Sequence, residues 1–512
     1  MPMSRIALIV AALAVAGAPC AQEEIDVYLD STAQVIRGFG AANIVSWRPD
    51  MTDAEIETAF GTGEGQLGLS ILRVKIDESP STWARSVPTA KKAFDRGVLV
   101  FASPWNAPDL LLIPGAEGDT VATDQYAAYA EHLAAFDAFM ADNGVDLYAV
   151  SVQNEPDYAD EWTGWSPEGM ITFLRDHAPA IGTRVIAPES FQFRREFSDP
   201  ILNDPEAAAH VDIVGGHTYG GGLGDYPLAR QLGKEVWMTE HYTDSQHSAN
   251  AWPLAFDVAE DVQRTMLSNM SAYVWWYIVR YYGPIADGET SAAFPDESVG
   301  AKGEVTKRGY LMSQFSRFVR PGYVRVHTDR RNPFSQVSAT AYRDGADLVV
   351  VALNSSSSPK EVALVFDGGV ADRFQPYVTD ETRNVEPLDE VVADGDRLAV
   401  TLGPRSTTTF VSSVRGVAAE PAAGPGPTLH PSRPNPVASG PARIAYTLSD
   451  AGPVTLTVYD VLGREVATLV DGTQGPGRYV VPFDTADLPS GTYTYRLVAG
   501  GQATHRQMTV AR

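Results

Sequence analysis

The 512-residue chain is long enough for several domains and a large hydrophobic core, and its composition, with 44% hydrophobic and 20% charged residues, is that of a globular protein. A formal net charge of −25 argues against a nucleic-acid partner, because such a surface repels phosphate groups. The single cysteine, Cys20, lies near the N-terminus, which excludes disulfides and cysteine metal sites from the rest of the chain.

Residues 1–21 predict a signal peptide. Arg5 supplies a short positive start, the apolar run IALIVAALAVAGA follows, and small residues precede Gln22. The apolar run is too short for a comfortable membrane span, and no later stretch is long and apolar enough to make one. We therefore expect a protein that is secreted or held at the cell surface, without a membrane span.

Eight apolar, strand-like stretches alternate with amphipathic helical patterns from about residue 35 to residue 318. The stretches are residues 34–40, 69–77, 98–105, 148–156, 184–190, 211–220, 235–242 and 272–280. Near-continuous apolar strands are typical of parallel sheets buried on both faces. Eight regular units favour a closed (β/α)8 TIM barrel over residues 36–318, with an open doubly wound sheet as the alternative.

The pattern changes after the barrel. Residues 319–414 carry short alternating strands that predict a side β-sandwich, which the strand-like residues 22–35 would join. Residues 415–430 are rich in Ala, Pro and Gly and are typical of a linker. Residues 431–512 alternate cleanly between apolar and polar positions and predict a small C-terminal all-β domain.

Two glutamates stand at the ends of predicted barrel strands, where barrels of this kind carry their active groups. Glu155 ends the fourth strand and Glu240 ends the seventh. Facing carboxylates suit glycoside hydrolysis, in which one protonates the leaving oxygen and the other attacks the anomeric carbon or activates water. One such glutamate is more often a helix cap or a salt-bridge partner, but two in the same layer favour a site.

Other strand ends carry groups that suit a sugar, because aromatic faces stack on a sugar ring and polar groups bind its hydroxyls. These residues are Arg73, Asp77, Trp105, His217, Tyr219, Tyr242, Trp275, Trp276 and Arg280. Taken alone, each tryptophan is more often part of a core, and His217 more often has a structural role. The stretch GEGQLG at 63–68 matches the dinucleotide fingerprint, but it precedes a strand instead of following one, so we interpret it as accidental. No Walker A, HExxH or GxSxG motif occurs, so we expect neither a cofactor nor a metal.

The stretches VSVQNEPDY, VGGHTYG, WMTEHYTDS and AYVWWYIVRYYGP resemble glycoside hydrolase family 30, and most closely its bacterial glucuronoxylanase branch, subfamily 8. The resemblance covers about residues 25–414 and implies a TIM barrel with a side β-sandwich and a retaining mechanism. It implies that Glu155 is the acid/base and Glu240 the nucleophile, with Arg73 favouring ionised Glu240. Asn154 would then bind the sugar 2-hydroxyl. The residues implied to line the sugar subsites are Trp105, Trp276 and Tyr219.

The same resemblance implies a substrate, glucuronoxylan, recognised by its 4-O-methylglucuronic acid branches. The implied uronate-binding residues are Arg280, Tyr282, Tyr242 and Ser245. A guanidinium with hydroxyls suits a carboxylate. The implied activity is that of a glucuronoarabinoxylan endo-1,4-β-xylanase (EC 3.2.1.136), and we expect the protein to be a monomer. Val279, where relatives commonly have a second arginine, and the stretch PWNAPDLLLIPG depart from the family pattern. The alternatives are a family-30 xylanase or xylobiohydrolase indifferent to the uronate, and a non-catalytic carbohydrate-binding surface protein.

The C-terminal tail, residues 431–512, resembles the sorting domain of the type IX secretion system. SRPNP at 432–436, LTVYDVLGREVATL at 456–469 and the later SGTYTYRL carry this resemblance. It implies export across a bacterial outer membrane, with the type IX secretion machinery as a partner, and removal of the tail, with anchoring of the protein at the cell surface as the other outcome. The alternative is a carbohydrate-binding or spacer module.

Overall fold

The computed structural model describes residues 22–412 and 427–511, with short gaps at 116–117, 159, 222–223, 346, 368–372, 430–431, 433–436, 438–441, 449–450, 462–463, 476, 487 and 501. The predicted signal peptide, nearly all of the predicted linker and most of the SRPNP motif lie outside the described residues. The chain divides into two compact units, residues 1–414 and residues 415–512.

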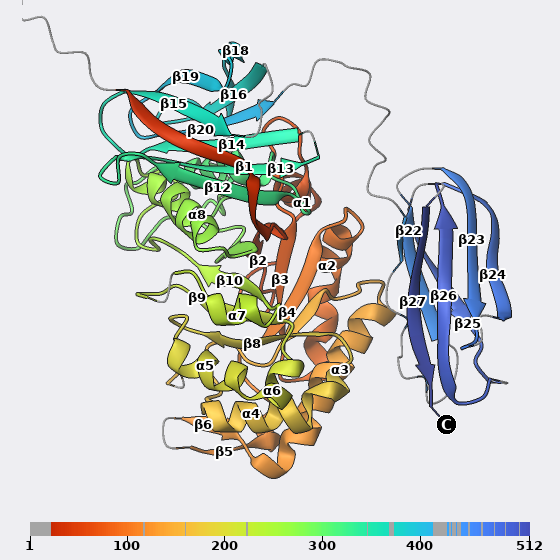
Figure 1. The fold of residues 1–512 in the computed structure, drawn as a ribbon. Helices are drawn as coiled ribbons and strands as arrows, with labels where there is room; N and C mark the ends of the chain where they lie inside the picture. The colour runs from red at the N-terminus through yellow and green to blue at the C-terminus, as the bar shows by residue number, and fades with distance from the viewer. Residues whose placement is uncertain are drawn as a thin grey trace, which may run out of the picture. The chain divides into compact units, whose positions relative to one another are not determined.

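Eight parallel strands of the first unit close into a barrel, which confirms the predicted TIM barrel and excludes an open doubly wound sheet (Figure 1). In ring order they are β2 (Gly38–Ala42), β3 (Ile71–Ile76), β4 (Leu99–Pro104), β7 (Ala149–Ser151), β8 (Arg184–Ser190), β9 (Ile213–His217), β10 (Glu235–His241) and β11 (Ala272–Trp275). Side chains such as Ile71, Phe101 and Trp237 fill the interior. The barrel is therefore a packed core whose chemistry lies at its mouth.

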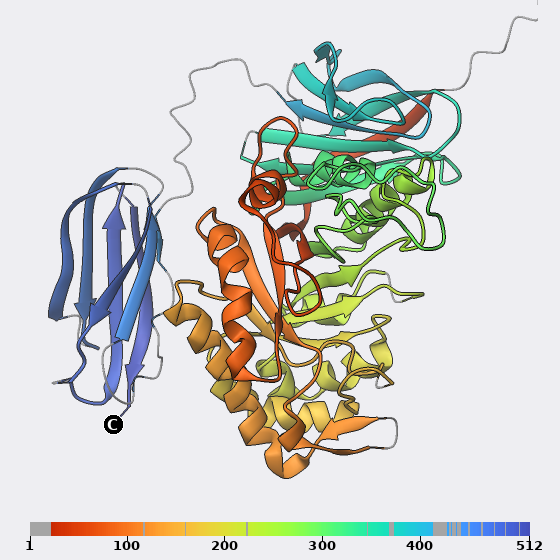
Figure 2. The ribbon, with the colours of Figure 1, turned by 180° about the vertical axis from the view of Figure 1, so that it is seen from behind.

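Helices surround the barrel, most of them connecting one strand to the next (Figure 2). They are α1 (Asp53–Phe60), α2 (Val87–Phe94), α3 (Tyr126–Asp142), α4 (Pro167–Asp176), α5 (Arg195–Asn203), α6 (Pro205–Ala209), α7 (Pro227–Gln231), α8 (Asp257–Leu267) and α9 (Lys307–Ser316). Helix α8 shows why they dock: Val258, Val262 and Met266 recur every four residues and are buried as one face. The loop after β4 adds a hairpin, β5 (Leu112–Pro114) with β6 (Asp119–Val121).

The side domain is one ten-stranded sheet. Its strands are β1 (Glu23–Val35), β12 (Val324–Arg330), β13 (Val337–Asp344), β14 (Asp347–Asn354), β15 (Lys360–Asp367), β16 (Arg373–Thr379), β17 (Glu386–Pro387), β18 (Val391–Val392), β19 (Arg397–Leu402) and β20 (Ser406–Ser412). Phe374 near one end of the sheet and Leu398 at the other end belong to the same core, so the sheet folds back on itself. The N-terminal β1 lies inside the sheet, between β12 and β15.

The other face of this sheet packs on the barrel. Tyr342, Val349 and Val351 belong to the same hydrophobic core as the barrel helices. Helix α9 adds polar contacts: the side-chain nitrogen of Gln314 donates to Thr379 over 2.8 Å, and the backbone carbonyl of Gln314 accepts from the Thr409 hydroxyl over 2.7 Å. Barrel and side sheet thus share one continuous core.

The second unit is a small all-β domain, as the alternating sequence predicted. One sheet contains β21 (Thr428–Leu429), β22 (Ala442–Leu448) and β25 (Gly477–Phe483), and the other contains β24 (Glu465–Gln474), β23 (Gly452–Tyr459), β26 (Gly491–Ala499) and β27 (Gln502–Val510). Ile444, Leu456 and Leu497 from both sheets meet in its core. In the described parts of the chain, every helix is too short or too polar to cross a membrane.

Candidate active site

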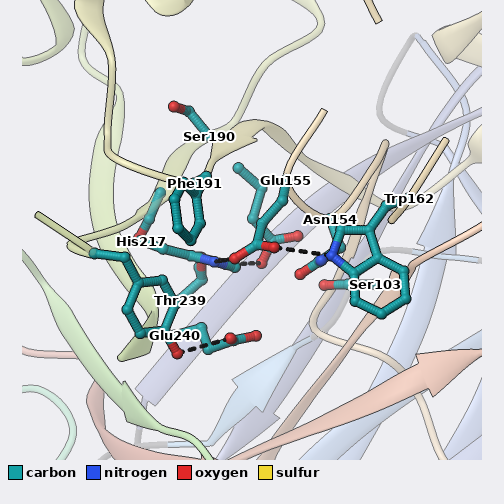
Figure 3. Close-up of polar contacts among 12 residues, drawn as sticks. Ser103, Asn154, Glu155, Trp162, Ser190, Phe191, His217, Thr239 and Glu240 are labelled. Atoms are coloured by element: carbon teal, nitrogen blue, oxygen red, sulfur yellow. Dashed lines mark hydrogen bonds and ion pairs between the residues drawn. The ribbon is translucent and has the colours of Figure 1, made fainter. Parts of the chain in front are cut away.

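Glu155 and Glu240 meet at the mouth of the barrel. One carboxylate oxygen of each lies within 4.8 Å of the other, and a ring nitrogen of His217 lies within the same distance of both (Figure 3). All three residues are buried. They come from three different strand ends, β7, β10 and β9, which a closed parallel barrel brings to the same rim.

The Glu155 side chain is held from two sides. The indole Nε1 of Trp162 donates to Oε2 over 3.0 Å, and Nδ1 of His217 lies 2.8 Å from Oε1 (Figure 3). Its backbone has a positive φ of 48°, and its amide donates to the carbonyl of Glu189 over 3.0 Å. The strained turn after β7 is thus fixed by β8, which aims the carboxylate across the barrel mouth.

The Glu240 carboxylate receives two donors. The Tyr219 hydroxyl donates to Oε1 over 2.9 Å, and the fully buried guanidinium of Arg73 donates to Oε2. Arg73 also donates to Oδ1 of Asn154 over 2.6 Å. The side-chain nitrogen of Asn154 is then left buried without a partner in the described part of the chain, as a donor available to a ligand.

A third carboxylate, Glu189, lies behind this pair, and sequence reasoning missed it. Oε1 of Glu189 accepts from Arg73 over 3.0 Å and lies 3.7 Å from Nε2 of His217, with all three side chains fully buried. Its signal was available, because the stretch RVIAPES ends the fifth barrel strand as Glu155 and Glu240 end theirs. Glu189 supplies the buried charge that Arg73 and His217 need.

Opposite charges set the protonation of this cluster. Burial disfavours the His217 imidazolium, but the Glu240 charge, the hydrogen bond to Glu155 and the nearby Glu189 carboxylate outweigh it and raise the pKa of His217 to about 9. Burial also opposes ionised Glu189, yet the Arg73 charge and His217 lower its pKa to about 2. Burial raises the pKa of Glu240, the Glu155 charge adds to this, and His217, Arg73 and Tyr219 oppose it. Because the two carboxyl groups lie so close together, ionisation of either Glu155 or Glu240 disfavours ionisation of the other.

The trio of Glu155, His217 and Glu240 also has the spacing of a cation site. A metal would require neutral imidazole, whereas the raised pKa of His217 means that a proton competes for the same nitrogen. The buried Arg73 guanidinium already binds Glu240 as a cation would. The donor set therefore suits proton transfer better than metal binding.

We expect the ion pairs of His217 to make the stability of the folded protein depend on pH in the alkaline range. Because its pKa rises from 6.5 to about 9 on folding, its contribution is complete below pH 6.5 and is lost as the pH rises through about 9. The free energy of unfolding of the wild-type protein should fall by up to about 3 kcal/mol over that pH range, and that of His217→Asn should not show this decrease. Calorimetric unfolding between pH 6 and 10 measures it, with exposed His327→Asn as the control. Equal pH slopes in wild type and His217→Asn would contradict the assignment.

Tryptophans surround the carboxylates, but they differ in how they face solvent. Trp105 is only 2% exposed and lies under the Arg73 guanidinium at 4.5 Å, so it forms the floor of the site. Trp47 is 41% exposed, and its ring lies within 6.0 Å of the rings of Trp105, Trp162 and Trp276. Sequence reasoning missed Trp47 and Trp162, because both stand in loops without periodicity.

A run of three tyrosine rings leads from Glu240 to Arg280. Tyr219, which donates to Glu240, lies 5.0 Å from the ring of Tyr242, and that ring lies 5.8 Å from Tyr282. The Arg280 guanidinium is 5.7 Å from the Tyr282 ring centroid. The loops after β9, β10 and β11 therefore bring the predicted uronate-binding residues to one side of the carboxylate pair.

Ser245 completes this group: it lies beside Tyr242, and its backbone carbonyl accepts a hydrogen bond from the Tyr281 hydroxyl over 2.6 Å. Arg280 is 15% exposed and has two acidic partners of its own: Nη1 donates to Asp287 over 2.8 Å and to Glu289 over 2.6 Å. Sequence reasoning missed both acids. Their sequence context, a long loop after β11, carries no strand or helix signal.

The chain is similar to known proteins over most of its length. It is 44% identical over 403 residues to "Glucuronoxylanase XynC" of Bacillus subtilis (strain 168), covering 76% of this chain and 92% of that protein. A solved GH30 endoxylanase from Clostridium papyrosolvens C71 has a TM-score of 0.68 and 36% identity, and covers 76% of this chain and 100% of that one. The subfamily 8 xylanase Xyn30A from Clostridium acetobutylicum matches with the same coverage and TM-score at 32% identity. No protein-family model matches the chain.

Proposed function

This chain belongs to glycoside hydrolase family 30, in its glucuronoxylanase branch, and we propose that it is a retaining endo-β-1,4-xylanase that cleaves glucuronoxylan beside its uronic acid branches. Glu155 is the general acid/base and Glu240 the nucleophile. Retaining enzymes hold their two carboxyl groups about 5–5.5 Å apart, whereas inverting enzymes leave room for a water between them. A closest approach within 4.8 Å supports retention.

In the first step Glu240 attacks the anomeric carbon while Glu155 protonates the departing glycosidic oxygen. Arg73 and Tyr219 each donate to a different oxygen of Glu240 and so hold the attacking carboxylate in place. The buried, unpartnered amide nitrogen of Asn154 suits the 2-hydroxyl of the sugar, a contact that strengthens in the transition state.

In the second step Glu155 acts as a base and removes a proton from the water that hydrolyses the glycosyl-enzyme. Esterified Glu240 no longer carries a charge, so the repulsion between the two carboxylates has gone. His217 stays against Glu155 on one side and Glu189 on the other, and thereby keeps the acid/base aimed through both steps.

The observation that carries the substrate proposal is the position of Arg280 at the end of the tyrosine run from Glu240. Arg280, Tyr282, Tyr242 and Ser245 offer a guanidinium and hydroxyls to a carboxylate on a branch of the bound polymer. In a protein of net charge −25 the general field repels an acidic polymer. Attraction therefore has to come from a local cation such as this one.

Arg280→Ala should lower kcat/KM on glucuronoxylan by about a hundredfold, because a charge-assisted contact to the substrate is lost. The same variant should leave the low activity on carboxyl-reduced glucuronoxylan unchanged. Arg280→Lys keeps the positive charge but lacks the planar guanidinium, so its kcat/KM on glucuronoxylan should lie between the values of the wild type and Arg280→Ala. Arg96→Ala, which removes an exposed arginine paired with Glu57, serves as the control.

Product masses complete this test. Oligosaccharides from the wild type should each carry one uronate at a fixed distance from the reducing end. Equal rates of wild type and Arg280→Ala on both polymers would instead support the alternative, a family-30 xylanase or xylobiohydrolase that does not need the branch. Binding without any release of sugars would support the non-catalytic alternative.

For its route, we propose that residues 1–21 direct export and that the C-terminal domain serves as a type IX sorting domain. The all-β fold of the second unit supports this, as does its stretch LTVYDVLGREVATL, which contributes to β23 and β24.

A further inference from the structure

Two arginine side chains converge on a single exposed carboxylate beside the tyrosine run. Nη1 of Arg280 lies 2.6 Å from Oε2 of Glu289, and Nη1 of Arg48 lies 3.2 Å from the same oxygen. Arg48 follows β2, and Glu289 lies in the loop after β11, so the two loops meet at the mouth of the barrel. Such convergence of guanidinium groups is the arrangement that binds a carboxylate ligand.

The two acids on Arg280 differ in how firmly they are held. Asp287 is 12% exposed, and its second oxygen accepts from the backbone amide of Glu289 over 3.0 Å, which fixes it in the loop. The Glu289 side chain is 58% exposed and reaches Arg280 from the solvent side. Exposed ion pairs of this kind are weak, because water and salt compete for both charges. Glu289 is therefore the replaceable partner and Asp287 the permanent one.

The charge count supports exchange of one carboxylate for another. With Glu289 in place, two arginines face two acids and the group is neutral. Without the Glu289 carboxylate, Asp287 still pairs with Arg280, and the positive charge of Arg48 is left without an acid among these four residues. That charge matches a single uronate, which carries one carboxylate.

We propose, on the premise of the function proposed above, that Arg48 and Arg280 together form the carboxylate site for the uronic acid branch. Glu289 occupies this site in the substrate-free protein, and the branch binds by displacing it. Arg48 then becomes a second specificity-determining residue, and Glu289 an internal competitor that sets the affinity for branched polymer.

The test measures KM and kcat on glucuronoxylan and on the same polymer after reduction of its carboxyl groups. Glu289→Gln should lower KM for the native polymer about three- to fivefold at unchanged kcat, and leave the reduced polymer unaffected. Arg48→Gln should raise KM for the native polymer by about as much, and again spare the reduced one. Glu57→Gln is the matched control, because Glu57 is 55% exposed, pairs with Arg96 over 3.1 Å and carries the same charge.

Glu289→Asp separates displacement from simple repulsion between Glu289 and the substrate. The shorter side chain keeps the charge but holds Arg280 less well, so displacement predicts a lowered KM as in Glu289→Gln, and repulsion predicts the wild-type value. A KM for Glu289→Gln that equals or exceeds the wild-type value would overturn the inference, as would equal effects of Arg48→Gln on both polymers. If wild type itself treats both polymers alike, the proposed uronate recognition fails instead.

Discussion

Glu240→Ala should abolish hydrolysis of glucuronoxylan, lowering kcat by about 10⁴-fold or more, because the carboxylate that forms the covalent intermediate is removed. The cavity left by the carboxylate gives room for a small anion beside Arg73 and Tyr219, which bind Glu240 in the wild type. Added azide should therefore restore cleavage. With Glu155 still present to protonate the leaving group, azide attacks directly and yields an α-glycosyl azide of inverted configuration.

The anomer of the azide product is the decisive measurement, made by nuclear magnetic resonance on the released oligosaccharides. Glu235→Ala is the control, since Glu235 lies at the other end of β10 and pairs with Arg37 over 2.6 Å. A β-configured azide from Glu240→Ala would reverse the roles of the two glutamates. Persistent wild-type activity would remove Glu240 from the mechanism altogether.

Glu155→Ala should slow cleavage of glucuronoxylan by about 10²- to 10⁴-fold, the range that general acid–base catalysis supplies. The loss should depend on the leaving group. A sugar alkoxide needs a proton to depart, whereas a dinitrophenolate does not, so the first step on a dinitrophenyl β-xylobioside should be nearly unaffected. The second step lacks its base, and the glycosyl-enzyme should accumulate.

Rapid-mixing kinetics with the dinitrophenyl substrate would show this as a burst of phenolate followed by slow turnover. Azide, which needs no base, should speed the slow phase and give a β-glycosyl azide of retained configuration. Glu161→Ala, an exposed glutamate in the same loop, is the control and should behave as wild type. Absence of both the burst and the azide effect would show that Glu155 does not act as the acid/base.

The barrel could be predicted because it follows from local patterns. Each of its eight strands is a short apolar stretch, and parallel strands buried on both faces tolerate few polar residues. Strand direction then decides which end carries chemistry. Glu155 and Glu240 were therefore predicted to share a rim, although 85 positions separate them in the sequence, and the structure places them there.

The sequence pattern alone determined the eight-stranded barrel, the side and C-terminal β domains, and the two glutamates at strand ends. Only the tertiary structure decided what surrounds those glutamates. Glu189 behind Arg73, Trp162 against Glu155 and Glu289 on Arg280 are contacts across 116, 7 and 9 positions, made by strand ends and loops. The physical reason is that the spacing of apolar residues reveals which face of a single helix or strand is buried. It does not reveal which polar side chains from different elements come into contact, because that depends on where the closed barrel places the loops.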